Sequence, residues 1–510
     1  MKQIVVVGHG MVGHRFLDEL ASRGLDVEVT VLAAEEGLPY NRVLLSEVLA
    51  GRYAPAAITL PKLSASAGTV HAGRRAVAID RMRRVVRDDA GAEYGYDALV
   101  LATGARARMP ELEGVEDLPL AAGAGLHVLR DLSDATELLA QVPAARRATV
   151  VGGGVLGLEI ALGLAGHGLV TTIVHGGTHL MDRQLAVGAG AAAEQVLAQA
   201  GVKVVAGSRP SAVSVDHGRV SALTLANGMQ ILTDLVVMAA GTVVDAEIVR
   251  AAGLPVSRGI VVGNDLASPA DPRVFAIGDC AAPPQGSTGL VAQGWEQARR
   301  LATILEQRLA DGGDLADAKS APDGETEDSL DASVPLPAGG TDVIRVKGAG
   351  IDIVTMGVSG SAHRPDGSRR VSLDDPDGAR YLEVVVADHR VIGATCVGGG
   401  RVASDLVAAY TRGTLVAADP AQLLIRPVAG SAVVAESPTR MPDRAVLCRC
   451  NSVTKGQIVE AWRGGARDLK AVASCTRATT GCGGCGDAVT GILEWLAASD
   501  PDRDAAEAAA

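Results

Sequence analysis

The sequence is poor in aromatic residues, carries an excess of acidic over basic residues, and lacks long apolar runs. Phe, Trp and Tyr make up 2% of the 510 residues and the net charge is −12, which argues against binding nucleic acid by stacking or by charge. No uninterrupted apolar run approaches the roughly 18 residues needed to cross a bilayer. The N-terminus enters an apolar strand without a basic leader or a cleavage site. We therefore expect a cytoplasmic protein without nucleic-acid or membrane partners.

Cysteine is missing from the first half of the chain. Seven cysteines occur and none precedes Cys280, which excludes a redox-active disulfide in the N-terminal region. Four of them form two close pairs, Cys448 with Cys450 and Cys482 with Cys485. In a reducing compartment, such pairs indicate a metal site more often than a disulfide.

Length and charge patterning divide the chain into several parts. A chain of 510 residues with 48% hydrophobic content is expected to form three or four domains. Residues 311–331 hold eight acidic side chains and one lysine, which is typical of a solvated linker. The segment 341–435 alternates short strands with turns before a helix, and predicts a small α+β domain. Beyond it, Thr454 and Gln457 have the spacing of a capping box that opens a helix.

A glycine-rich turn near the N-terminus predicts a dinucleotide site. Gly8, Gly10 and Gly13 follow an apolar strand and open a helix, so they can supply a tight turn, room for a pyrophosphate and close helix–strand packing. The diphosphate would meet the free N–H groups of the helix N-terminus. Glu35, with Glu36 as the alternative, ends the next strand where an acid would accept ribose hydroxyls.

A second turn of the same kind lies 144 residues further on. Gly152, Gly154 and Gly157 repeat the pattern and predict a second dinucleotide site. His175 ends the following strand, at the position where an acidic residue would favour NADH and an arginine would favour NADPH. A histidine satisfies neither rule, so the choice between NADH and NADPH stays open, with a slight preference for NADH. The helix carries Glu159 on an otherwise apolar face. Two interpretations of Glu159 are possible: it lies near the reacting rings of the two cofactors, or it lies on the helix surface without a role in the site.

The cysteine pairs predict a metal centre. Cys448-x-Cys450 and Cys482-x₂-Cys485 are separated by 31 residues, and four thiolates suit either Zn²⁺ or [2Fe–2S]. Zinc sites usually favour two Cys-x₂-Cys pairs, so [2Fe–2S] is the preferred assignment, with zinc and unligated thiols as alternatives. Cys475 is left over and is expected to be a neighbour rather than a ligand.

Longer segments carry a resemblance to a known group of enzymes. Residues 39–46 (PYNRVLLS), residues 179–185 (HLMDRQL) and the cysteine module resemble the N-terminal part of the assimilatory NAD(P)H-nitrite reductase large subunit. They equally resemble the electron-transfer subunit of assimilatory nitrate reductase. Residues 102–104 and 274–279 are similar to segments of the wider flavoprotein superfamily with two dinucleotide sites. The cysteine spacing is similar to that of the bacterioferritin-associated ferredoxin type of [2Fe–2S] domain.

The resemblance implies an α/β fold with two Rossmann-like domains, a small α+β domain and a small helical [2Fe–2S] domain. The implied limits are 1–110 with 232–310 for FAD, 111–231 for NAD(P), 311–340 for the acidic linker, 341–435 for the α+β domain and 446–497 for the [2Fe–2S] domain. The implied FAD contacts are Gly8, Gly10, Gly13, Glu35, Arg42, Thr103, Gly104, Gly278, Asp279 and Trp295. The implied NAD(P)H contacts are Gly152, Gly154, Gly157, Glu159, His175 and Gly241, with Cys448, Cys450, Cys482 and Cys485 as cluster ligands.

The implied activity is NAD(P)H-dependent electron transfer through FAD and the [2Fe–2S] cluster to a separate catalytic subunit. The sirohaem and [4Fe–4S] module of nitrite reductase uses two further cysteine pairs, whereas the three remaining cysteines of this chain are scattered. We therefore expect no nitrite reduction by this chain alone. A molybdenum-cofactor nitrate reductase is the preferred partner and a sirohaem nitrite reductase subunit the alternative. A non-catalytic nucleotide and iron–sulfur sensor is the rival from another class. Relatives often carry a lysine near Glu47, and this chain departs from them there.

Overall fold

The structure is a computed structural model. It describes residues 1–115, 118, 124–310, 342–348, 350–360, 362–416, 419–425, 441–448, 453–479 and 485–499. The acidic linker predicted at 311–340 lies outside the described residues. Among the described residues, no helix is both long enough and apolar enough to cross a membrane.

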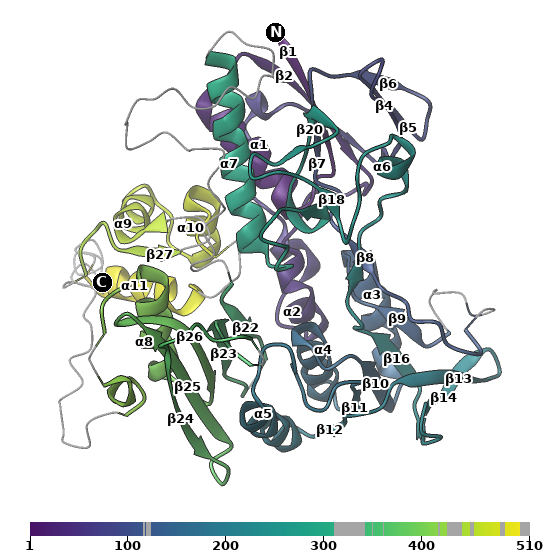
Figure 1. The fold of residues 1–510 in the computed structure, drawn as a ribbon, viewed down its shortest axis with the longest axis vertical. Coiled ribbons are helices and arrows are strands. Elements are labelled where there is room, and N and C mark those ends of the chain that lie inside the picture. Colours follow the sequence, from purple (N-terminus) through teal and green to yellow (C-terminus); the bar gives the residue numbers. More distant parts are fainter. Residues whose placement is uncertain are drawn as a thin grey trace, which may run out of the picture.

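The first sheet contains the N-terminal strand at its centre. Its order is β19-β20-β7-β1-β2-β3, and the strands are parallel except at the β19–β20 pair. The bounds are β1 Lys2–Val7, β2 Val27–Ala33, β3 Thr69–Ala72, β7 Ala98–Leu101, β19 Ala267–Ser268 and β20 Asp271–Ala276. Helices α1 (Met11–Arg23) and α7 (Val291–Ala310) pack side by side against this sheet (Figure 1). Strand β1 is central because its apolar run is buried on both faces, as in parallel sheets generally.

The second sheet is wholly parallel and repeats the arrangement. Its order is β12-β11-β10-β16-β9. The bounds are β9 Leu126–Val128, β10 Arg147–Val151, β11 Val170–Val174, β12 Val202–Val205 and β16 Leu235–Met238, with helices α3 Leu132–Gln141, α4 Val155–Gly166 and α5 Val187–Gln199. Helix α4 is apolar almost all round because it is covered by α2 (Leu45–Leu49) and β22 (Ile344–Val346) as well as by its own sheet.

Short antiparallel ribbons and a helix decorate the two sheets. They are β4 Ala76–Asp80, β5 Val85–Asp88 and β6 Glu93–Gly95; β13 Pro210–Asp216, β14 Arg219–Leu225 and β15 Gln230–Leu232; β8 Arg106–Ala107 with β17 Thr242–Val243; and α6 Glu247–Ala251. A short parallel pair, β18 Ile260–Val261 with β21 Ala281–Ala282, lies beside the first sheet. The β8–β17 pair joins the two sheets at their adjoining ends.

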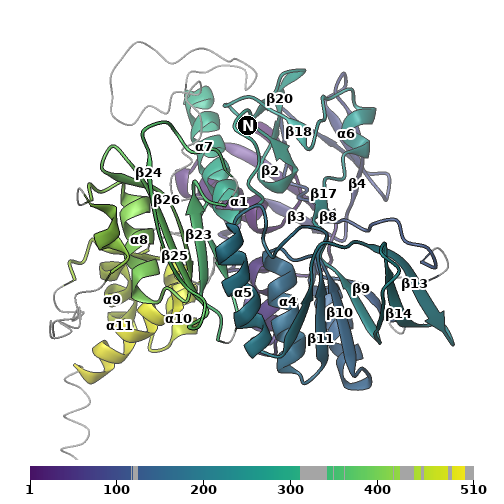
Figure 2. The ribbon, with the colours of Figure 1, turned by 60° about the horizontal axis from the view of Figure 1, so that its bottom comes forward.

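The predicted α+β domain is an antiparallel sheet covered on both faces. The order is β22-β23-β26-β25-β24, with β23 Ile353–Gly357, β24 Arg369–Asp375, β25 Arg380–Ala387 and β26 Arg390–Val397. Helix α8 (Arg401–Arg412) covers one face, and α5 of the second nucleotide domain packs against the other (Figure 2). The apolar residues Val346, Ile353 and Val397 share a core with that domain. The α+β unit is therefore attached to the second nucleotide domain by apolar packing.

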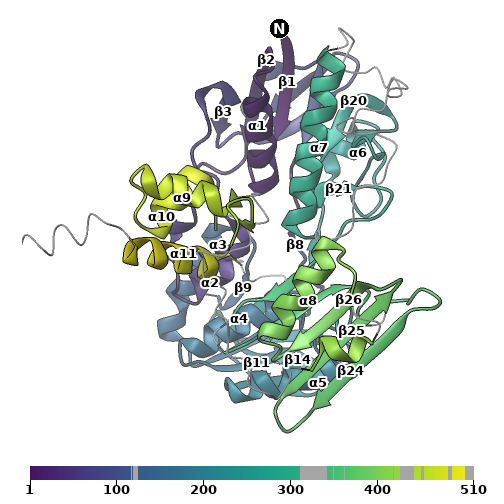
Figure 3. The same ribbon diagram turned by 90° about the vertical axis from the view of Figure 1, so that its left-hand side faces the viewer.

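The C-terminal module is small and mainly helical. It comprises β27 Val446–Cys448, β28 Val453–Thr454, α9 Lys455–Arg463, α10 Leu469–Thr476 and α11 Gly486–Ala498. The predicted capping box is present, since Thr454 accepts from the backbone N–H of Gln457 and the Gln457 side chain accepts from the N–H of Thr454. The module lies beside α1 of the first domain (Figure 3). The predicted fold class is confirmed. The predicted domain limits stay a prediction, and β16 falls in the predicted FAD segment 232–310 although it pairs within the second sheet.

Candidate functional site

The first glycine turn forms an open cradle at the N-terminus of α1. Gly8 has φ +108°, and a Cβ there would lie 2.3 Å from the carbonyl oxygen of Ala102. A Cβ on Gly13 would lie 2.3 Å from the carbonyl oxygen of Gly8. Gly10 differs, because its φ is −76° and the nearest neighbour of a Cβ is Arg42 Nε at 3.9 Å. Gly8 and Gly13 are thus required by the fold, while the absence of a side chain at Gly10 gives the room that a pyrophosphate would need.

The second turn shows the same steric difference between its three glycines. Gly152 has φ +126°, and a Cβ there would lie 2.2 Å from the carbonyl oxygen of Ala239. A Cβ on Gly157 would lie 1.8 Å from the carbonyl oxygen of Gly152. Gly154, the N-cap of α4 with φ −84°, has nothing within 4 Å of its would-be Cβ. Two sterically equivalent cradles therefore exist, and Gly241, with φ +96°, also has open space around it.

Glu35 lies in a polar cluster just after β2. Its carboxylate accepts a hydrogen bond from Tyr40 Oη at 2.8 Å and pairs with the Arg42 guanidinium. Arg42 also lies over the Tyr40 ring, 5.2 Å from its centroid. Burial raises the pKa of the Tyr40 hydroxyl, which stays a neutral donor. Glu36, the alternative, is exposed like Glu35, and the geometry favours Glu35 because Tyr40 and Arg42 hold its carboxylate.

Asp279 is paired with an arginine that the sequence did not reveal. Arg130 Nη2 lies 2.7 Å from Asp279 Oδ2, and Arg130 Nε donates to the carbonyl of Ala105 at 2.7 Å. The Arg130 carbonyl accepts from Arg42 Nη1 at 3.3 Å. Arg130 thereby joins three predicted FAD-site segments, including the turn at Gly104. Arg130 follows a short strand without any motif, so only the folded chain identifies it.

Gly278 and Thr103 complete this corner of the first domain. Gly278 has φ +77° and its N–H donates to Gln297 Oε1 at 2.6 Å, which ties the Asp279 turn to helix α7. Thr103 follows β7, directly before the left-handed Gly104. The nearby Cys280 is fully buried, and burial raises the pKa of its thiol. Cys280 is therefore a packing residue.

Glu159 is buried and held by partners from two other parts of the chain. It is 4% exposed, so the helix-surface interpretation is wrong. Its Oε2 accepts from Ser46 Oγ at 2.6 Å, and its Oε1 accepts from the backbone N–H of Lys347 at 3.0 Å and from Lys347 Nζ at 2.7 Å. Lys347 belongs to the α+β unit, 188 residues away in sequence. Glu47, near which relatives often carry a lysine, pairs with Arg52 at 2.5 Å.

His175 supports the second glycine turn. The backbone N–H of Gly153 donates to His175 Nδ1 at 3.2 Å, which leaves the ring proton on Nε2. Nε2 lies 3.4 Å from Asp182 Oδ1, close enough for attraction but outside hydrogen-bond geometry. His175 is thus engaged with the turn itself, and Asp182 brings a carboxylate close to the end of β11.

The structure brings two of the four predicted cluster ligands into one core. Cys448 is 1% exposed and Cys485 is 8% exposed, and both pack with Val453 and Val489 in the C-terminal module. Cys450 and Cys482 lie outside the described residues. Cys475 is exposed and lies apart from this core. Two thiols converging in an apolar, water-poor core fit a buried metal–sulfur centre.

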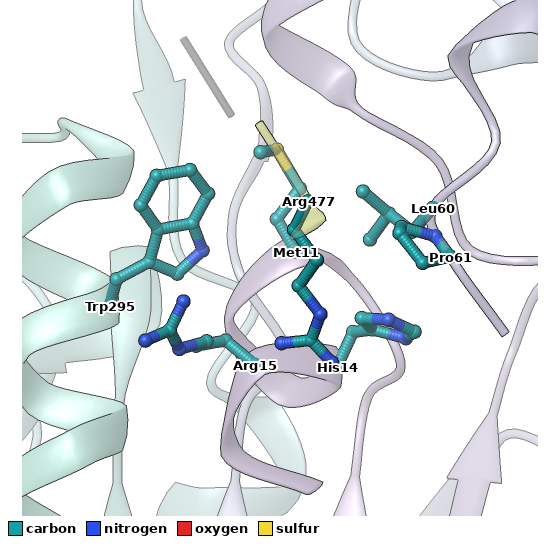
Figure 4. A pocket seen from close by; sticks show the side chains of 7 residues that line it. All are labelled: Met11, His14, Arg15, Leu60, Pro61, Trp295 and Arg477. Carbon is teal, nitrogen blue, oxygen red and sulfur yellow. The ribbon is translucent and has the colours of Figure 1, made fainter. Parts of the chain in front are cut away.

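Trp295 lies where the first domain meets the C-terminal module. It is 5% exposed, on helix α7. It lines a small pocket together with Met11, His14, Arg15, Leu60, Pro61 and Arg477 (Figure 4). Residues from α1, from α7 and from the module therefore face one space beside the first glycine turn.

These features define a class of protein. Two glycine cradles on parallel sheets, followed by a module with buried cysteines, characterise a flavin- and nicotinamide-dependent oxidoreductase that handles single electrons. Residues 2–300 match the family described as pyridine nucleotide-disulphide oxidoreductase. The chain belongs to this family, and residues 446–495 match the BFD-like [2Fe-2S] binding domain. It is an NAD(P)H-dependent FAD oxidoreductase with a [2Fe–2S] domain.

The comparison with individual proteins agrees with this family. The chain is 33% identical over 505 residues to the nitrite reductase [NAD(P)H] large subunit of Klebsiella oxytoca, covering 96% of this chain and 49% of that protein. It is 27% identical over 510 residues to the assimilatory nitrate reductase electron transfer subunit of Bacillus subtilis, covering 99% and 61%. The chain thus spans about half to three fifths of the length of these relatives. A ferredoxin reductase structure from Rhodopseudomonas palustris superposes with a TM-score of 0.66 at 23% identity, covering 78% of this chain and 91% of that one.

Proposed function

We propose that this chain is the electron-input subunit of an assimilatory nitrate reductase, which oxidises NAD(P)H and delivers electrons to a separate molybdenum-cofactor subunit. The observation that carries the proposal is the combination, in one chain, of two open glycine cradles with a cysteine module attached to the helix that follows the first cradle. A nucleotide-binding sensor would not need that attachment. The likeness to the nitrate reductase electron transfer subunit supports the choice of partner.

The first cradle is proposed as the FAD site. The space at Gly10 and the N-terminal N–H groups of α1 hold the pyrophosphate, and the Glu35 carboxylate accepts the ribose hydroxyls. Arg42 and Arg130 fix the positions of Glu35 and Asp279 through their ion pairs. Thr103, Gly104, Gly278 and Trp295 are proposed as the remaining contacts.

The second cradle is proposed as the NAD(P)H site. Gly154 and the N-terminus of α4 receive the pyrophosphate, and His175 holds the turn in shape. Glu159, fixed by Ser46 and Lys347, is proposed to lie near the reacting rings. FAD held in the first cradle would supply the conversion from a two-electron hydride donor to single electrons, which suits an iron–sulfur acceptor. Cys448, Cys450, Cys482 and Cys485 are the proposed ligands of that acceptor.

A second candidate partner is a sirohaem nitrite reductase subunit. It is favoured by the 33% identity to a nitrite reductase large subunit. In either case the 510-residue chain alone is expected to form no ammonium from nitrite. Apart from the four proposed ligands it has only Cys280, Cys396 and Cys475, and a [2Fe–2S] centre with four cysteine ligands offers no open position for a nitrogen substrate.

The test supplies NADH or NADPH, the purified chain, and each candidate catalytic subunit in turn, and measures nitrite or ammonium. Nitrite formed from nitrate with the molybdenum subunit supports the proposal. Ammonium formed only with the sirohaem subunit would show that the second candidate, the sirohaem nitrite reductase subunit, is the partner. Ammonium formed by the chain alone would mean that the centre that reduces nitrite lies in this chain and not in a separate subunit.

The order of electron transfer has its own test. Cys482→Ser should abolish reduction of a one-electron protein acceptor, while NAD(P)H-dependent ferricyanide reduction, which draws directly on the flavin, stays largely intact. Equal loss of both activities with FAD retained would contradict the order. Cys475→Ser is the matched control, because Cys475 is exposed and is not a proposed ligand.

A further inference from the structure

An ion pair links the C-terminal module to the first helix of the FAD domain. The guanidinium of Arg477 pairs with the carboxylate of Asp18 on α1, and the two side chains are 25% and 26% exposed. Helix α1 is the element whose N-terminus forms the proposed FAD cradle. Arg477 precedes Cys482, a proposed cluster ligand, by five residues. The contact therefore joins the two proposed redox sites through one short segment of each domain.

The backbone of Arg477 is in a conformation that normally favours glycine. Arg477 ends α10 in the left-handed region with φ +65°, and its N–H donates to the Ala473 carbonyl at 2.8 Å. Helices α1 and α8 end in the same conformation, but with Gly24 and Gly413. A non-glycine residue in this position costs free energy. An arginine here is therefore better explained by its side chain than by the turn.

The side chain of Arg477 enters the pocket that holds Trp295. Figure 4 shows it running between Trp295 on one side and Leu60 and Pro61 on the other. Burial lowers the pKa of Arg477 to about 10, and the nearby Arg15 guanidinium adds to this effect. Arg477 nevertheless stays charged at neutral pH. An arginine that is partly desolvated beside another cation needs a compensating partner, and Asp18 supplies it.

We propose that Arg477 is a positioning residue that docks the iron–sulfur module on the FAD domain through Asp18, so that the C-terminal end of α10 is held beside Trp295. The partner is the α1 face of this same chain. This inference rests on the proposed electron path from flavin to cluster. It predicts that breaking the pair loosens the module and slows electron arrival at the cluster without altering the cradles.

The test exchanges the two charges in the full-length holoprotein. Arg477→Asp places two carboxylates together, and aspartate tolerates the left-handed backbone better than most residues. Arg477→Asp with Asp18→Arg restores opposite charges. Lys470→Asp is the matched control, because it makes the same charge change at an exposed position of the same module. Arg477→Asn removes the charge without introducing repulsion and covers the case in which the aspartate variant does not fold.

Two measurements read out docking and electron transfer separately. Hydrogen–deuterium exchange of residues 11–23 and 469–476 reports the contact, and freeze-quench electron paramagnetic resonance reports cluster reduction after NAD(P)H is added. For Arg477→Asp we expect exchange about tenfold faster and cluster reduction about tenfold slower, with flavin reduction within about twofold of wild type. The charge swap should recover most of both effects, and Lys470→Asp should show neither.

Unchanged exchange in Arg477→Asp and Arg477→Asn, or a swap that recovers nothing, would overturn the docking role. Altered exchange with unchanged cluster reduction would overturn its effect on electron arrival. A wild-type cluster that NAD(P)H never reduces would instead contradict the proposed function, and the exchange data would still decide whether Arg477 docks the module.

Discussion

Each glycine turn separates residues that the fold requires from one that the ligand requires. Four of the six motif glycines have a carbonyl oxygen less than 2.5 Å from their would-be Cβ, whereas Gly10 and Gly154 do not. Motif spacing alone treats all of them alike. The steric difference supports the proposal that ligands bind at the two open positions. It can be tested at each cradle separately.

We expect Gly154→Ala to weaken NAD(P)H binding by about tenfold to a hundredfold, with FAD content unchanged. The reason is that a methyl group in the pyrophosphate space costs about 1–3 kcal/mol, as other overpacking does. Gly10→Ala should do the reverse, lowering FAD content while the apoprotein keeps its stability. Nucleotide titrations and flavin-to-protein ratios measure the two effects. Equal behaviour of the two variants would argue against separate sites.

Because the His14 side chain is buried, we expect the folded protein to lose stability in acid. Burial lowers its pKa to about 3, and His9 and Arg477 add to the effect. The unfolded chain therefore takes up a proton near pH 6.5 that the folded chain refuses, so stability falls as the pH drops from 6.5 towards 3. At pH 5 this group should cost about 2 kcal/mol relative to pH 7.

Urea unfolding of the apoprotein at pH 7 and pH 5, followed by circular dichroism, measures that loss. His14→Gln should remove most of it. His217→Gln is the matched control, because the His217 side chain is 95% exposed. If the two variants lose stability in acid to the same extent, the assignment to His14 is wrong.

At the scale of elements, local patterns predicted most of what was found. The strand–turn–helix units β1–α1 and β10–α4 follow from apolar runs and the glycine turns that end them, and the capping box of α9 follows from the Thr454–Gln457 spacing. What could not be predicted are the contacts between distant elements. Arg130 and Lys347 carry no motif, and their partners lie 149 and 188 residues away. Tertiary packing alone brings these groups together.

The contact of α4 with β22 yields a stability prediction. Lys347→Met leaves the Glu159 carboxylate buried without its cation, which should cost roughly 3 kcal/mol of unfolding free energy. Adding Glu159→Gln to that variant should recover a large part of the loss, because an amide is cheaper to bury than a charge. Chemical denaturation of the three proteins measures this.

Lys203→Met is the control for that experiment, since Lys203 is exposed on β12 of the same domain. It should change stability by about 0.5 kcal/mol or less. If Lys347→Met behaves like this control, the ion pair contributes little and β22 is held to α4 by apolar packing alone.

At the scale of the whole molecule, the cofactor content is the decisive quantity. We expect the purified chain to carry about one FAD and one [2Fe–2S] cluster, because one complete first cradle and one set of four cysteines are present. Cys485→Ser should lose the cluster absorbance and labile sulfide but retain FAD, since the module has a separate core. If metal analysis finds zinc and no labile sulfide, the four cysteines bind zinc and the [2Fe–2S] assignment is wrong.

The first sheet is assembled from two distant stretches of chain, and this affects how the protein is made. Strand β20 and helix α7 lie after the whole second sheet in sequence, yet β20 pairs directly with β7 beside the central strand. When β16 has just left the ribosome, every strand of the second sheet is available for pairing. Strands β19 and β20, which form one edge of the first sheet, have not yet emerged. During synthesis, the domain of the second sheet can therefore close before the domain of the first sheet, although the first sheet starts at residue 2. Flavin capture at the proposed FAD site must wait until α7 has emerged.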